Sequence, residues 1–415
     1  MNPFPIALAA LRRNSFTAFL FLVIVALAVA LGIAISAQER ALRVGSARAA
    51  DKFDLIIAAP GSHNDVLFST VYLDPTAVQL LDPAIARLLL DEPEADFVAP
   101  IGFGDAIGTD PVVGTIAPFV DHLSGGLAEG RLFEALDEAV VGALSPHKVG
   151  DELEVSHGHG GATDADADAA ADALEAGEAV QGEHEHAHLH VVGRMQPTGT
   201  PWDRAIVVPI EYNWLAHGLG TGHRPQDSHI GTPFDADALP GLPAVVVKAK
   251  DISAAYGLRA AYRTPQSTAF FPAEVLIGLY ALLGDATAIM SALTLAAQAL
   301  VVAAILAGVV AILDLQRQRF AVLRALGASP LFVFTTVWIY VAAIVVTGAL
   351  MGLVLGWGAA TLVSDLLAQS TGVAMRAEIG TRELSLVGTL VTLGLLLAVV
   401  PALIIYRRPV VDALR

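Results

Sequence analysis

The run FTAFLFLVIVALAVALGIAISA, from Phe16 to Ala37, decides the fold class of this chain. It contains no charged residue, and about 20 apolar residues are enough for a helix to cross the hydrocarbon core of a bilayer. Three further runs without Asp, Glu, Lys or Arg follow at 286–313, 331–363 and 384–406. We therefore expect four membrane-spanning helices. The third run is longer than a span needs, so we expect it to tilt or to continue as helix outside the bilayer.

Arginines near the ends of these runs indicate the orientation, because cytoplasmic loops are enriched in Lys and Arg. They lie before the first run (Arg12, Arg13), between the second and third (Arg317, Arg319, Arg324) and after the fourth (Arg407, Arg408, Arg415). Both termini are therefore expected in the cytoplasm. The expected segments are a cytoplasmic N-terminus 1–15, spans 16–37, 286–313, 331–363 and 384–406, extracytoplasmic regions 38–285 and 364–383, a cytoplasmic segment 314–330 and a cytoplasmic C-terminus 407–415.

A cleavable signal peptide, even one of the twin-arginine type, is the alternative interpretation of the N-terminus. Arg12 and Arg13 would be its basic part, and cleavage would follow the end of the apolar run near Ser36 and Ala37. Signal sequences have apolar cores of about 7 to 15 residues, whereas the run 16–37 is about 22 residues long. An even number of spans also leaves both basic ends on one side without cleavage, so the sequence favours a retained span.

The composition agrees with a membrane protein and excludes other classes. Hydrophobic residues make up 55% of the 415 residues and charged residues only 16%, which is too apolar for an ordinary soluble protein. There is no cysteine, so disulfides and thiolate metal sites are excluded. The net charge of −17 argues against nucleic acid as a partner. Between Gln38 and Asp285 lie 36 of the 41 Asp and Glu residues but only 14 of the 24 Lys and Arg residues. The rest of the chain is therefore net basic.

The region 38–285 is long enough for one or two domains and combines α and β signals. Four short β-branched runs bounded by Gly and Pro predict buried strands: DLIIAA from Asp54, LHVVG from Leu189, AIVVPI from Ala205 and AVVVKA from Ala244. PAIARLLLDE from Pro83 predicts an amphipathic helix opened by proline. The expected fold class is a membrane protein with four transmembrane α-helices and a large mixed α/β extracytoplasmic domain between the first and second helix.

Residues 156–190 have a different character. Their centre consists of Ala, Gly, Asp and Glu without large apolar residues, so we expect a mobile loop. Its edges carry six histidines: His157, His159, His184, His186, His188 and His190. The last four alternate along the chain, so on a strand they would share one face and offer imidazoles to Zn(II) or another transition metal. A solvated His-rich loop that binds metal only weakly is the alternative.

The segment LQRQRFAVLRALGASP, Leu315 to Pro330, predicts a short cytoplasmic helix. Its apolar stripe consists of Phe320, Leu323 and Leu326. Gly327 suits a C-cap, and Pro330 prevents the helix from continuing. The pattern alone fits equally well a helix lying among lipid headgroups and a helix that docks on another protein.

This segment closely resembles the signature of FtsX-like permeases, the family that includes lipoprotein-releasing and macrolide-exporting (MacB-type) ABC transporters. The family pattern runs R-x-x-E-I-A-V-L-R-A-L-G-A, and Arg317 to Ala328 follow it almost continuously. The chain's last residues, PALIIYRRPVVDALR, resemble the family's ending P-A-x-x-A-x-R-x-x-P-x-x-A-L-R. The residues assigned to this motif are Pro401, Arg408, Pro409, Ala413, Leu414 and Arg415. The extracytoplasmic region is similar more loosely, and it has GALSPHKVGD where relatives place a longer helix.

The resemblance implies that the cytoplasmic helix couples to a separate ABC ATPase that holds ATP and Mg²⁺. The coupling residues would be Arg317, Arg319, Phe320, Val322, Leu323, Arg324, Leu326 and Gly327. The family also implies a homodimer, or a heterodimer with a similar permease. The chain has no phosphate-binding loop, serine nucleophile elbow or zinc-protease helix, so we expect no catalytic residue and no ATPase activity of its own.

The expected function is therefore a permease subunit in the bacterial inner membrane. It would serve lipoprotein, peptide or amphiphile export, or transition-metal (zinc) homeostasis. One alternative is a signalling subunit that activates an extracytoplasmic partner such as a cell-wall hydrolase, and another is a membrane-anchored enzyme. Expected partners are the ATPase, a second permease, a periplasmic or extracellular protein and membrane lipid. For the chain itself, the cofactor considered is a metal at the histidines of 156–190.

Overall fold

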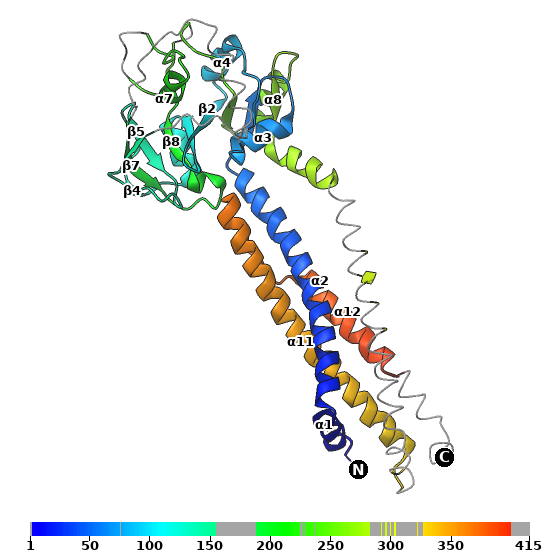
Figure 1. The fold of residues 1–415 in the computed structure, drawn as a ribbon. Coiled ribbons are helices and arrows are strands. Elements are labelled where there is room, and N and C mark those ends of the chain that lie inside the picture. Colours follow the sequence, from blue (N-terminus) through cyan, green and yellow to red (C-terminus); the bar gives the residue numbers. More distant parts are fainter. Residues whose placement is uncertain are drawn as a thin grey trace, which may run out of the picture. The chain divides into compact units, whose positions relative to one another are not determined.

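The computed structural model describes residues 2–74, 76–154, 188–224, 227, 229–235, 237–282 and 327–399, with isolated positions at 292, 295–296, 299, 303 and 322. The chain divides into two compact units. The helical unit comprises Met1–Val44, Ala281–Ala368 and Met375–Arg415, and the sheet unit comprises Gly45–Tyr280 and Gln369–Ala374. Figure 1 shows the elements of both units.

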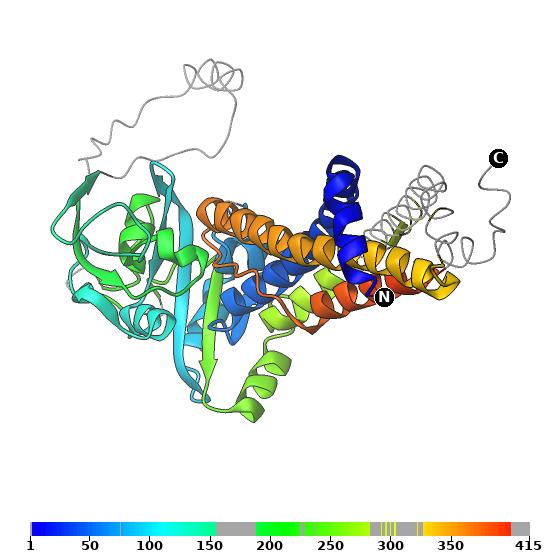
Figure 2. The same cartoon turned by 90° about the horizontal axis from the view of Figure 1, so that it is seen from below.

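Four helices are described in the helical unit: α1 (Phe4–Arg13), α2 (Ser15–Ala50), α11 (Pro330–Thr371) and α12 (Thr381–Leu397). Helices α2 and α11 lie side by side in Figures 1 and 2 and share a core that includes Val25, Val29, Val341 and Val345. In the part of the chain that the structure describes, α2 and α11 are the two helices long and apolar enough to cross a membrane.

Both long helices extend past the apolar runs that predicted them. Helix α2 continues to Ala50, beyond the expected end at 37, because the following residues AQERALRVGSARAA are mostly good helix formers. Helix α11 has 42 residues, or about 63 Å at 1.5 Å per residue, roughly twice the thickness of a hydrocarbon core. The expected loop 364–383 is therefore shortened to the residues between Thr371 and Thr381.

Two of the four expected spans are described only in part or not at all. The second, 286–313, lies outside the described residues except for isolated positions. The fourth, 384–406, begins within α12, and its last residues also lie outside them. The number of spans therefore stays a prediction.

A ten-stranded mixed sheet forms the centre of the sheet unit as described. Its strands are β1 (Leu55–Ala58), β2 (Ala95–Ile107), β3 (Asp110–Thr115), β4 (Leu127–Gly130), β5 (Glu138–Val141), β6 (Glu152–Glu154), β7 (His188–Met195), β8 (Ile206–Pro209), β9 (Ala244–Ala249) and β10 (Thr268–Phe270). The order is β10-β1-β9-β2-β3-β8-β5-β7-β4, and β6 also pairs with β7. Strands β3 and β8, and β5 and β7, pair in parallel, and the other pairs are antiparallel.

The four β-branched runs became β1, β7, β8 and β9, and the mixed α/β prediction for this region is confirmed. Strands β1 and β8 are buried throughout, as their continuous apolar composition predicts. The longest strand, β2, was not predicted. It contains Pro100, Gly102 and Gly104, residues that interrupt the usual strand pattern.

The sheet unit also contains helices α3 (His63–Val71), α4 (Pro83–Leu90), α5 (Ala117–Ser124), α7 (Ile210–Ala216) and α8 (Ile252–Ala261), a 3₁₀ turn, Pro201–Arg204, and most of a helix over Pro272–Leu282. The prediction of an amphipathic α4 is confirmed: the Asp82 side chain caps it at the Ala84 amide, and Ala86 and Leu89 are buried. Phe53, Phe119 and Trp202 form an aromatic cluster in the core, with ring centroids 5.5 to 6.0 Å apart.

The segment 142–151, GALSPHKVGD, contains turns and no helix. The Arg194 guanidinium organises it by donating hydrogen bonds to the carbonyl oxygens of Gly142 and Ser145, at 3.2 and 3.1 Å, and to those of Ala143 and His147. One charged side chain thus satisfies a run of carbonyl groups that a helix would have satisfied internally.

Candidate functional site

Three glycines bring α11 into close contact with α2. Gly348, Gly352 and Gly356 are four residues apart and therefore lie on one face of α11. A Cβ atom at these positions would lie 2.8 Å from Val25 Cβ, 2.5 Å from Ala26 O and 2.6 Å from Ala30 O, respectively. Small residues at this spacing are typical of helix pairs in membranes, where close backbone approach supplies the packing energy.

Gly352→Ala is expected to destabilise the helical unit by about 1–3 kcal/mol, because the new methyl group overlaps a backbone carbonyl that cannot move aside. Gly358→Ala on the same helix is the matched control, since its Cβ would meet no described atom within 4 Å. It should be neutral or stabilising by up to about 1 kcal/mol, the helix preference of Ala over Gly. Apparent melting temperatures of the two variants in detergent would test this. Equal shifts would contradict the packing described above.

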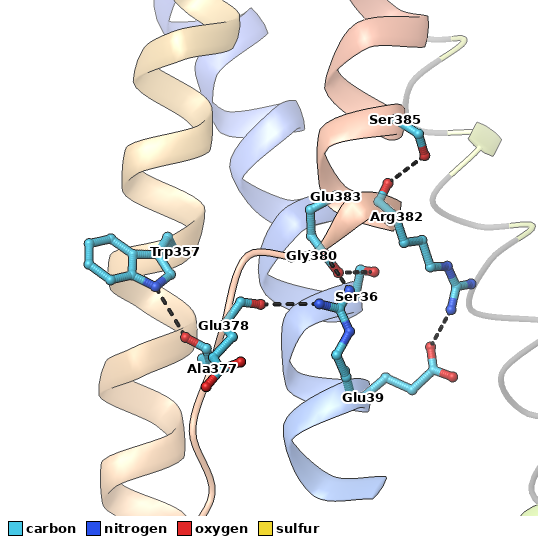
Figure 3. Close-up of polar contacts among 10 residues, drawn as sticks. Ser36, Glu39, Trp357, Ala377, Glu378, Gly380, Arg382, Glu383 and Ser385 are labelled. Atoms are coloured by element: carbon cyan, nitrogen blue, oxygen red, sulfur yellow. Dashed lines mark hydrogen bonds and ion pairs between the residues drawn. The ribbon is translucent and has the colours of Figure 1, made fainter. Parts of the chain in front are cut away.

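A buried ion pair joins α2 to the start of α12 (Figure 3). The side chain of Glu383 is 0% exposed and pairs with the guanidinium of Arg40, whose side chain is 32% exposed. Ser36 Oγ donates to Glu383 Oε1 at 2.6 Å, and the Gly380 amide donates to Glu383 Oε2 at 2.8 Å. Both carboxylate oxygens of Glu383 are therefore satisfied, as a buried charge requires.

The chain between α11 and α12 is held by the same group of contacts. Arg40 Nη1 donates to the Glu378 carbonyl oxygen at 3.4 Å. Trp357 Nε1 on α11 donates to the Ala377 carbonyl oxygen at 3.1 Å, as Figure 3 shows. The Ala377 side chain packs with Ala37 and Ala360, one from each long helix. This connection is therefore fixed to α2 and α11 by both polar and apolar contacts.

A second pair, between Arg382 and Glu39, lies at the surface beside the buried one. Its atoms are 3.4 Å apart, and Glu39 also pairs with Arg43 at 3.0 Å. Exposed pairs of this kind contribute little to stability. We therefore treat Ser36, Arg40, Gly380 and Glu383 as the core of the contact and name them the α2–α12 lock.

The α2–α12 lock links the two helices through one ion pair and hydrogen bonds. Sequence reasoning missed it. The available signals were an arginine four residues after Ser36, at the end of the first apolar run, and a glutamate directly before the fourth. Neither signal predicts the contact, because nothing in the sequence indicates that these two distant residues meet.

The expected coupling residues lie mostly outside the described residues. This holds for Arg317, Arg319, Phe320, Leu323, Arg324 and Leu326, and for the C-terminal positions Pro401, Arg408, Pro409, Ala413, Leu414 and Arg415. Val322 is described and exposed. Gly327 has a φ of +96°, the left-handed conformation that favours glycine at helix ends. Ser329 then caps α11 by accepting a hydrogen bond from the Phe332 amide at 3.2 Å.

Of the six histidines at the edges of 156–190, the structure describes His188 and His190; His157, His159, His184 and His186 lie outside the described residues. His188 and His190 occupy the same exposed face of β7, opposite Glu154 and Glu152 of β6. His190 Nδ1 lies 3.6 Å from Glu152 Oε1.

The carboxylates around His190 differ in their availability. His190 Nε2 lies 3.9 Å from Asp137 Oδ2, across the surface from Glu152. Glu138, the residue paired with His190 on β5, accepts hydrogen bonds from Arg131, which hold the pKa of that carboxyl below its usual range. Glu138 is therefore occupied by an arginine, and Asp137 and Glu152 are the acids adjacent to this face.

Comparison with known proteins gives one result for the C-terminal part of the chain. Residues 289–410 match the family model described as FtsX-like permease C-terminal. This match includes the predicted cytoplasmic helix, α11 and α12, and therefore the Glu383 side of the α2–α12 lock. No curated protein matches the chain.

Proposed function

Because this chain is a membrane protein of the FtsX-like permease family, we propose that it is the transmembrane subunit of an ABC transporter in a bacterial inner membrane. Permeases of this family work with a cytoplasmic ATPase and are generally not catalytic themselves. ATP binding and hydrolysis by that partner would move the extracytoplasmic domain through the membrane helices. The observation that carries this proposal is the family match over 289–410.

The arrangement of the permease would be four spans with both termini in the cytoplasm. Helices α2 and α11, which are long and apolar enough to cross a membrane, would supply two spans, and α12 would begin the fourth. The apolar run 286–313 would supply the second. The sheet unit, with its acidic composition, would then lie outside the cytoplasm as one domain between the first two spans.

Single-cysteine labelling tests this arrangement, because the chain has no cysteine of its own. Ser62→Cys, at an exposed position of the sheet unit, should react with a membrane-impermeant maleimide in spheroplasts. Gln318→Cys, in the expected cytoplasmic segment, should react only after the membrane is permeabilised. Reaction of Gln318→Cys in sealed spheroplasts, or protection of Ser62→Cys, would reverse the orientation and remove the proposal.

Mechanical transmission is favoured over a solute channel by the composition of the spans. The apolar runs 16–37 and 331–363 contain no ionisable Asp, Glu, Lys or Arg, and a substrate site at the bilayer midplane usually needs such residues. The outer domain would then act on a lipoprotein, peptide or other amphiphile. The same observation supports the second candidate, a non-transporting subunit that activates an extracytoplasmic hydrolase. Identifying the proteins that co-elute with the chain from native membranes would distinguish the two.

A role in transition-metal homeostasis is the more specific version of this proposal. It is supported by His188 and His190, which present imidazoles on one face of β7 with Glu152 and Glu154 opposite. Two imidazoles and a carboxylate suit Zn(II) and other first-row divalent metals. A dimer with a second copy or a similar permease would present two such faces to an extracytoplasmic partner.

A further inference from the structure

A second group of histidines lies in the connection between α7 and β9, away from the His-rich segment. Its members are His223, Asp227 and His229, and their potential ligand atoms all lie within 4.8 Å of one another. The two imidazole rings have centroids 4.3 Å apart, and His229 Nδ1 lies 3.0 Å from Asp227 Oδ1. Two imidazoles and one carboxylate are thus gathered within seven residues of chain.

A buried carboxylate supports this group from α7. Glu211 Oε1 lies 3.1 Å from His223 Nε2, and both side chains are only 2% exposed. The Gly231 amide donates to the same oxygen at 2.6 Å. Among the described residues, Glu211 Oε2 is buried and has no hydrogen-bond partner. A buried carboxylate with an unsatisfied oxygen is costly unless a positive charge lies nearby.

The rigidity of the site comes from aromatic packing around His223. Its ring stacks on Phe234 at a centroid distance of 5.1 Å, and Phe234 packs edge-on against Trp214 of α7 at 5.4 Å. Gly222 is required beside it, because a Cβ there would lie 2.6 Å from the Trp214 ring. His223 is therefore a fixed, buried member, whereas Asp227 and His229 are partly exposed and reachable from solvent.

We propose that His223, Asp227 and His229 form a binding site for a divalent transition metal, Zn(II) by preference, with Glu211 orienting His223. A carboxylate that accepts from one imidazole nitrogen leaves the other nitrogen for the metal and increases its basicity. Zinc–ligand bonds of about 2 Å place ligands no more than about 4 Å apart, a distance that small movements of the exposed Asp227 and His229 would reach. A fourth position would remain for water or a substrate group, which suits an exchangeable site.

The site differs from the histidines of β7 in a way that favours specific binding. His190 and its acidic neighbours are all about half exposed or more, so any metal there would replace a solvated surface pair. His223 and Glu211 instead have already lost their contact with water. This inference adds a metal site to the proposed extracytoplasmic domain, but it rests on these four side chains and not on the permease assignment.

The test uses the full-length chain in detergent, purified without a polyhistidine tag. His157, His159, His184, His186, His188 and His190 are first replaced with Gln, so that the His-rich segment cannot contribute. Zn(II) stoichiometry is measured by elemental analysis, and affinity by competition with a chromophoric chelator. We expect one Zn(II) per chain in this background.

Asp227→Asn and His229→Ala, both at partly exposed positions, should each weaken Zn(II) binding by at least about 10-fold. Glu211→Gln should weaken it by roughly 10- to 100-fold, the usual effect of removing a partner that orients a ligand. His217→Ala is the matched control, because its side chain is 43% exposed, close to the 39% of His229, and it too lies beside a carboxylate, Asp105. The affinity of His217→Ala for Zn(II) should equal that of the background protein.

Two results would overturn the proposal. One is no bound Zn(II) in the background that lacks the six replaced histidines, and the other is an unchanged affinity for Zn(II) in both Asp227→Asn and His229→Ala. A loss of Zn(II) binding in His223→Ala alone would also overturn the proposal. Removing that buried ring disturbs the fold, so such a loss would not identify His223 as a ligand. None of these measurements involves the ATPase, so failure here would leave the permease proposal intact.

Discussion

Arg40→Ala is expected to destabilise the helical unit, lowering its free energy of unfolding by about 3 kcal/mol. This is the low end of the cost of breaking a buried ion pair. The reason is that the Glu383 carboxylate would lose its positively charged partner inside the protein and keep only neutral hydrogen-bond donors such as Ser36 and the Gly380 amide. The low end applies because Arg40 itself is partly exposed and already reaches solvent. The apparent melting temperature in detergent should fall by roughly 5–10 °C.

Arg382→Ala is the matched control, because it removes an arginine of the neighbouring exposed pair with Glu39. Its effect should stay below about 1 kcal/mol. The double variant Arg40→Ala/Glu383→Gln should be more stable than Arg40→Ala alone, since the uncompensated charge is then gone while the amide still bonds to Ser36 and Gly380. A double variant no more stable than the single one would show that the buried charge is not what makes Arg40 necessary.

The sequence predicted the parts of this fold that depend on local composition. Apolar runs located α2 and α11, and β-branched runs located β1, β7, β8 and β9. Each signal works because its residues lie within one element and bury one surface. The extent of the elements was less predictable. The polar ends of α2 and α11 remain helical, since helix propensity does not require an apolar side chain.

Contacts between distant residues could not be predicted in the same way. Ser36 and Glu383 are separated by 347 positions, and Glu211 and His223 by a turn and part of a long connection. In both cases the sequence shows only single polar residues, and a single polar residue is ordinarily expected to have a solvated side chain. Their significance depends on burial, which is a property of the fold and not of any one segment. The spacing H-x-x-x-D-x-H of 223–229 was visible but less conspicuous than the six histidines before it.

The glycine contacts and the α2–α12 lock have complementary roles. Gly348, Gly352 and Gly356 hold α2 against α11 over two turns, whereas Ser36, Arg40 and Glu383 hold α2 against α12. A displacement of α11 or α12 caused by a cytoplasmic partner would therefore be passed to α2. In the proposed arrangement such a displacement would begin at the segment before α11, where the expected ATPase contact lies.

Leu323→Asp is accordingly expected to abolish association with the ATPase while leaving membrane insertion intact. The residue lies at the centre of the predicted apolar stripe of Phe320, Leu323 and Leu326, within the family match. Placing a carboxylate in a desolvated contact costs several kcal/mol, and 4 kcal/mol is about a thousandfold in affinity. Co-purification of the ATPase with the tagged chain measures the effect.

Gln318→Asp provides the control for charge. It introduces the same carboxylate into the same segment, but on a helix it lies about 140° from Leu323 and about 80° from Leu326, the nearest residue of the stripe. It should therefore retain the ATPase. If Leu323→Asp also retained it, the segment would be an interfacial helix that lies among lipid headgroups, and the coupling of ATP hydrolysis to this chain would need another contact. Loss in both variants would point to a general effect of negative charge at the cytoplasmic surface.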